Sequence, residues 1–80
     1  MDKDVDIRAY FAQHAHEAFN QRLVNMASKQ MVRAGIESMK ILCGMTVEEI
    51  VRTRNIGEKS QEVVLTMREK YAQENQIRLS

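Results

Sequence analysis

Arg54-Asn55-Ile56-Gly57-Glu58-Lys59-Ser60 is the stretch of this sequence that indicates the fold most strongly. Asn55 and Gly57 are residue types that tight connections between helices favour. Before them, residues 46–49 (Thr-Val-Glu-Glu) form a capping box, the pattern with which a helix begins. After them, apolar residues recur at helical steps as far as Tyr71. The stretch therefore predicts a tight turn between a helix of barely two turns and a longer last helix.

Composition extends the helical prediction to the whole chain. The 80 residues include no proline and three glycines, and residues of high helix propensity dominate the rest. We predict an all-α fold, a compact bundle of about five short helices with helix-hairpin-helix motifs and an amphipathic N-terminal helix in front. The predicted helices cover residues 4–20, 25–34, 38–43, 47–53 and 58–74, and no strand is expected. The predicted core includes Leu23, Met31, Ile36, Met39, Leu42, Ile50, Ile56, Val64, Met67 and Leu79.

Polar residues and glycines set the predicted helix ends. Either Asp4 or Asp6 can cap the first helix. Gly35 follows the second helix, at the point where a residue in the left-handed backbone conformation often ends a helix. Ser38 is placed to cap the third helix, and Gly44 is placed to end it.

The predicted N-terminal helix carries three of the four aromatic residues, among them Phe11 and Phe19. An amphipathic helix with so much apolar surface has to bury it. Its partner is either the rest of the same domain or a second chain, and the sequence alone leaves both possibilities open.

Segments further along the chain occur in a familiar order. Val32-Arg33-Ala34-Gly35-Ile36 is followed by Met45-Thr46-Val47-Glu48-Glu49-Ile50, by the stretch at 54–60, and by a helix closing at Ile77-Arg78-Leu79. This order and spacing resemble, without gaps, the C-terminal domain of the bacterial RNA polymerase alpha subunit. The stretch at 54–60 is similar to that family's Arg-Asn-Leu-Gly-Lys-Lys-Ser. We therefore interpret residues 1–22 as an added N-terminal helix and residues 23–80 as a stand-alone relative of that domain.

The resemblance implies a bundle of short helices that grips the DNA minor groove upstream of promoters and docks transcription activators. The positions that match DNA-contacting positions of the family are Asn55, Gly57, Lys59 and Ser60. Met26 stands where the family inserts an arginine into the groove, and Lys29 stands where the family has a groove-contacting asparagine. Glu58 replaces a lysine that is usual in the hairpin. The resemblance thus implies the fold more strongly than promoter binding.

Charge also bears on the DNA hypothesis. The formal net charge is only +1, so the field of a strongly basic nucleic-acid binder is absent and any contact depends on local placement. Four residues are candidates for a local basic patch around the hairpin loop, namely Lys29, Arg33, Arg52 and Arg54, although charged helix residues commonly form only a solvated face. The amides at the start of the last helix can attract a phosphate, whereas Glu58 competes for the same place.

Met26 admits a second interpretation. A methionine on a helix face suits an adaptable protein contact, and the N-terminal helix of the same or a neighbouring chain is the nearest partner. Met26, Phe11 and Phe19 are therefore the candidate residues for a protein interface or a homodimer.

No catalytic or metal-binding constellation is visible. His14 and His16 are two residues apart, so on a helix they point in opposite directions and cannot hold one ion. The single cysteine, Cys43, lies among apolar neighbours and is expected to be a buried structural thiol. We expect no enzyme activity and no cofactor. With no secretory signal and no apolar run of the roughly 20 residues that span a membrane, a cytoplasmic protein is expected.

The predicted function is weak, salt-dependent binding of double-stranded DNA in connection with transcription. The predicted DNA contacts are Lys29, Arg33, Asn55, Gly57, Lys59 and Ser60. The alternative is a protein-interaction or dimerisation module that kept the fold but lost the groove-binding arginine.

Overall fold

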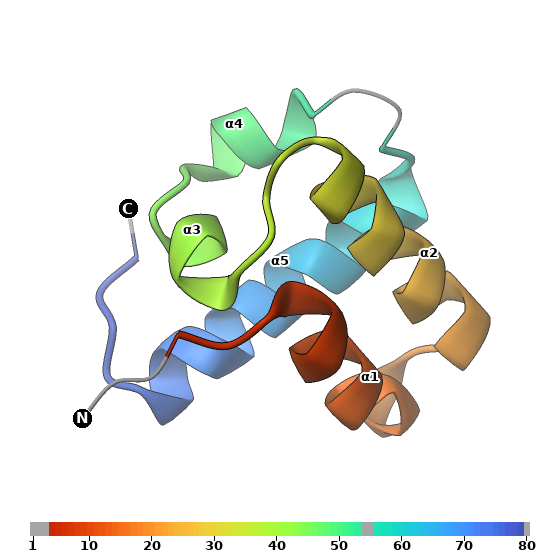
Figure 1. Cartoon of the computed structure of the whole chain (residues 1–80), viewed down its shortest axis with the longest axis horizontal. Coiled ribbons are helices and arrows are strands. Elements are labelled where there is room, and N and C mark those ends of the chain that lie inside the picture. The colour runs from red at the N-terminus through yellow and green to blue at the C-terminus, as the bar shows by residue number, and fades with distance from the viewer. Residues whose placement is uncertain (1–3, 54–55, 80) are drawn as a thin grey trace.

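The computed structural model describes residues 4–53 and 56–79, the side chains of residues 15–18 excepted. Five helices follow one another along this part of the chain (Figure 1). They are α1 (Ile7–Ala18), α2 (Gln21–Arg33), α3 (Met39–Cys43), α4 (Val47–Val51) and α5 (Glu58–Glu74). The all-helical prediction is confirmed, and within the residues described no strand occurs beyond one isolated bridge between Asp6 and Ser38.

The helix ends follow local chemistry. Of the two candidate caps of α1, Asp6 is the one used, and its carboxylate accepts a hydrogen bond from the Ala9 N–H at 3.1 Å. Gly35 has a φ of +89°, as predicted for the residue after a helix end. Thr46 and Glu49 form the predicted capping box, with reciprocal hydrogen bonds at the start of α4.

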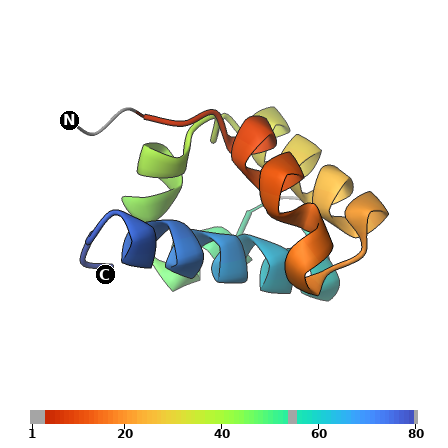
Figure 2. The same cartoon turned by 90° about the horizontal axis from the view of Figure 1, so that it is seen from below.

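The long helix α5 organises the bundle. It lies along one side of the molecule, and α1 and α2 form a layer across it (Figure 2). Helices α2, α3 and α4 each pack against α5, while α1 packs against α2. The first and last residues described, near 4 and 79, lie at one end of the molecule, and α2 and the first turns of α5 lie at the other (Figures 1 and 2).

The segment before α1 is tied to the start of α3 by backbone hydrogen bonds. The Met39 N–H donates to the Val5 carbonyl at 2.8 Å, and the Ile7 N–H donates to the Glu37 carbonyl at 3.0 Å. The Lys40 N–H also donates to the Asp4 carboxylate at 3.1 Å. These bonds fix where α1 begins relative to the rest of the bundle.

Helix α1 is part of the single hydrophobic core. Ile7 and Phe11 have no exposed surface, and Tyr10 stacks edge-on against Tyr71 of α5 with ring centroids 5.2 Å apart. The Tyr10 hydroxyl donates to the Glu74 carboxylate at 2.6 Å. The question left open by the sequence is thus answered, because α1 buries its apolar face against its own chain.

Most of the predicted core is confirmed. Met31, Ile36, Met39, Leu42, Ile50, Val64 and Met67 are buried. Leu23, Ile56 and Leu79 are only partly buried and pack against the rim of the core. No helix in the portion described is long and apolar enough to cross a membrane.

Candidate nucleic-acid interface

The exposed face of α2 carries a cluster of positive charge. Arg22, Lys29 and Arg33 are all exposed and are seven and four residues apart, which places them on one side of the helix. Helix α2 contains no aspartate or glutamate. A shallow depression of about 500 Å³ runs along this face and is lined by Arg22, Asn25, Met26, Lys29, Gln30 and Arg33. We call these residues the α2 face.

Met26 is 48% exposed and lies in the middle of the α2 face. Of the two partners considered for Met26, the N-terminal helix of its own chain does not cover it. The side of α2 next to α1 carries Asn25, Ser28, Lys29 and Val32, which line the groove between these helices. Because successive helical residues are about 100° apart, Met26 points away from that side. Position 26 is therefore accessible to solvent.

The cations of the α2 face have no carboxylate within ion-pair distance among the residues described. Arg52, at the C-terminal end of α4, differs because it forms an exposed ion pair with Glu48 at 2.9 Å, and Arg54 lies outside the residues described. Charges that are not neutralised locally are available to an incoming polyanion. The α2 face thus concentrates a positive potential that the net charge of +1 does not reveal.

The start of α5 supplies a second set of candidate contacts. Gly57, Glu58 and Lys59 are exposed, and no side chain caps the helix at Gly57. Open amides at a helix start favour an anion, and Lys59 adds a positive charge. Glu58 opposes this, because its carboxylate occupies the first turn and repels a phosphate.

Ser60 requires a correction. It is only 3% exposed, so its hydroxyl does not lie on the surface where a phosphate would bind. Ser60 shares the helical spacing of Val63, Val64 and Met67, all of which face the core from α5. That spacing was visible in the sequence and predicted burial, whereas the resemblance predicted contact. Asn55 lies outside the residues described.

Phe11 also requires a correction as a candidate interface residue. Its ring has no exposed surface and belongs to the chain's own core. Phe19 follows α1 and is partly buried against the same core. Neither ring forms an accessible apolar patch, because burying them is how α1 is held to the bundle.

The sequence interpretation missed three members of the α2 face, namely Arg22, Asn25 and Gln30. Arg22 precedes the residues that carry the resemblance, and Asn25 has no counterpart among the family contacts. The helical spacing of Arg22, Lys29 and Arg33 was the signal that could have identified the whole face.

Two residues weighed for catalysis, Cys43 and His14, pack against other parts of the chain, and the His16 side chain lies outside the part described. Cys43 is buried, and desolvation raises the pKa of its thiol, which the positive charge of Arg68 only partly offsets. Its sulfur lies 3.9 Å from the Arg68 carbonyl oxygen. The His14 ring packs against Tyr10 with centroids 4.4 Å apart. No group of His, Cys, Asp or Glu among the residues described is placed to hold a metal ion.

No protein-family model, no curated protein and no solved structure matches the chain.

Proposed function

We propose that the chain is a non-enzymatic, transcription-associated domain that binds double-stranded DNA through backbone phosphates and the minor groove, with little sequence specificity. The observation that carries this proposal is the α2 face, where three exposed cations share one helix side without a carboxylate. Cations of this kind supply the sequence-independent part of DNA affinity. The resemblance of residues 23–79 to the polymerase alpha C-terminal domain adds support and suggests a helix-hairpin-helix arrangement. The compartment we propose is the cytoplasm.

Each cation has a proposed role. Arg22, Lys29 and Arg33 bind phosphates along the exposed side of α2. Gly57 and Lys59 bind a further phosphate at the start of α5, and Asn55 is the third residue proposed for this contact. Ser60 is left out of the interface because it is buried.

Salt dependence follows from the number of contacts. Each phosphate that a cation neutralises contributes about −0.9 to the slope of log K against log salt concentration. Three contacts on α2 give a slope near −2.7, or roughly a 40-fold loss of affinity between about 50 and 200 mM salt. Such a domain binds weakly on its own at physiological salt.

The test is a fluorescence-anisotropy titration of a short labelled duplex at low and moderate salt. Lys29→Ala and Arg33→Ala should each weaken binding and make the slope shallower by about 0.9. Arg78→Ala is the matched control, because it removes the same charge from an exposed residue near the C-terminal end, which lies opposite α2 (Figure 1). If Arg78→Ala weakens binding as much as the α2 variants do, attraction is due to overall charge and the proposed interface is wrong.

A second candidate function rests on Met26. An exposed methionine amid cations suits an adaptable contact with an acidic protein surface. This alternative predicts that Met26→Ala weakens a protein complex while duplex DNA leaves the amide NMR signals of α2 unmoved. Molecular mass in solution tests the homodimer version, which now has to use Met26 rather than the buried ring of Phe11.

A further inference from the structure

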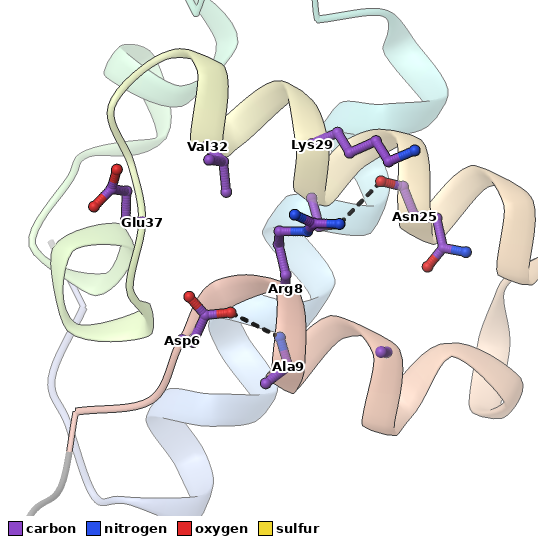
Figure 3. A pocket seen from close by; sticks show the side chains of 9 residues that line it. Asp6, Arg8, Ala9, Asn25, Lys29, Val32 and Glu37 are labelled. Carbon is purple, nitrogen blue, oxygen red and sulfur yellow. Dashed lines mark hydrogen bonds between the residues drawn. The ribbon is translucent and has the colours of Figure 1, made fainter.

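A groove of about 760 Å³ lies between α1 and α2, on the flank of the α2 face (Figure 3). Its walls are Arg8 and Ala9 of α1 and Asn25, Lys29 and Val32 of α2. None of these α1 residues belongs to the part of the chain that carries the family resemblance. The groove is therefore a feature of this chain's own N-terminal helix.

Arg8 occupies an unusual place in α1. It is the second residue of the helix, where the helix dipole disfavours a positive charge. It is exposed, and the residues described offer it no carboxylate within ion-pair distance. Neither helix stability nor an ion pair accounts for a cation at this position.

The Arg8 side chain crosses the groove. Figure 3 shows it extending from α1 toward α2, into the part of the groove where Lys29 and Asn25 lie. Two positive groups that face the same space repel one another, and an anion between them removes that repulsion. A guanidinium fork and an ammonium group are the two side-chain groups that most often bind phosphate.

Two carboxylates, those of Asp6 and Glu37, also line the groove, and among the residues described neither forms an ion pair with Arg8. Asp6 caps α1 by accepting the Ala9 N–H at 3.1 Å. Glu37 lies at the opposite end of the groove from Lys29 and Asn25 (Figure 3). The buried Ser28 hydroxyl is not a further donor for an anion, because it already donates to the Asn25 carbonyl at 2.9 Å.

We infer that Arg8 and Lys29 bind one phosphate group across this end of the groove, with the Asn25 amide as a third donor. If that phosphate is a phosphodiester of DNA, the inference rests on the proposed function and extends its interface from α2 onto α1. The other source of the same chemistry is a free phosphate. Lys29 then belongs both to the α2 face and to this site, so its loss should cost more than the loss of Arg33.

The first arm of the test uses duplex DNA and the variant Arg8→Ala. We expect weaker binding and a salt slope shallower by about 0.9, which corresponds to roughly a 3.5-fold smaller loss of affinity between about 50 and 200 mM salt. Arg8→Lys should retain most of the affinity, and Arg78→Ala is again the charge-matched control. The melting temperature of Arg8→Ala should not fall, since alanine removes a cation from an unfavourable helix position.

The second arm uses inorganic phosphate, with sodium chloride at equal ionic strength as its control. NMR signals of the Arg8 guanidinium and of the Asn25 side-chain amide should shift with phosphate, and Arg8→Ala should abolish the shift at Asn25. If this occurs while duplex DNA does not bind, the site takes free phosphate and the proposed DNA function fails.

The two ideas can fail separately. If DNA binds and Lys29→Ala weakens it, but Arg8→Ala has no effect and phosphate moves no signal, the groove site is refuted while the DNA function stands. If neither duplex DNA nor inorganic phosphate perturbs these residues, both are refuted.

Discussion

Replacing Met26 by arginine tests the α2 face most directly. It introduces the charge that the polymerase alpha C-terminal domain, which the sequence resembles, has at this position. The residue is 48% exposed, so the new guanidinium can remain in water. Arg22 lies one turn earlier on the same face, and a like-charge pair at that spacing costs about 0.2–0.5 kcal/mol. The melting temperature should therefore fall by no more than roughly 4 °C.

DNA binding should change much more than stability. One added phosphate contact steepens the salt slope by about 0.9 and raises affinity several-fold at low salt. The gain should be larger on A·T-rich duplexes, whose narrow minor groove has an enhanced negative potential that attracts arginine. Anisotropy titrations of A·T-rich and G·C-rich duplexes measure both effects. Met26→Gln is the control, because it removes the apolar side chain without adding charge.

Two results would refute this reasoning. A folded Met26→Arg variant that melts like the parent and binds DNA no better would show that the α2 face does not meet the duplex. A loss of several kcal/mol in the free energy of unfolding would show that position 26 is buried, since that is the order of the cost of an unpaired buried charge.

Three further predictions concern residues whose position the structure clarifies. Ser60→Ala should leave DNA affinity unchanged, whereas Lys59→Ala should lower it on all DNA sequences alike. Anisotropy titrations in which both variants lower DNA affinity equally would contradict the burial of Ser60. Phe11→Ala should lower the free energy of unfolding by about 3–5 kcal/mol and Phe19→Ala by less, as measured by circular dichroism in urea. Equal losses of stability in the two variants would contradict the deeper burial of Phe11. Desolvation tends to raise the pKa of Asp4, but hydrogen bonds from Ser38 and the Lys40 N–H outweigh it and lower the pKa below its ordinary value of 3.8. The stability that this carboxylate contributes is therefore fully present above pH 3.8 and is lost as the pH falls through the lowered pKa. Melting curves recorded below about pH 5 should show a smaller acid loss for Asp4→Asn than for the parent, and identical curves would contradict the assignment.

Helix ends were predictable because their determinants are local. The Thr46–Glu49 capping box and the left-handed Gly35 depend on residues within one turn of the helix end. The burial of Ser60 was also within reach of the sequence, since it shares the spacing of the core residues of α5. At that position helical periodicity was the better guide, and the resemblance misled.

The partner of α1 could not be predicted, because an amphipathic helix shows the same pattern whether it covers its own chain or another. What decides the matter is long-range contact. The Tyr10 hydroxyl bonds Glu74, 64 residues away in sequence, and the Val5 carbonyl accepts the N–H of Met39. The groove between α1 and α2 depends on that same docking. Arg8 therefore could not be identified as a candidate site residue before the helices were placed.

Net charge was a poor guide to the site because opposite charges are segregated among the helices. Helix α2 carries three cations and no carboxylate, whereas α4 and α5 together have a net charge of −3. At about 0.1 M salt the Debye length is roughly 10 Å, so a duplex near α2 responds mainly to α2 and hardly to the chain as a whole. The same segregation limits the interface, since Glu58 lies where the last helix begins. We therefore propose that a bound duplex takes most of its contacts from α2 and Arg8, and that Glu58 weakens the contact made by its neighbour Lys59 at the start of α5.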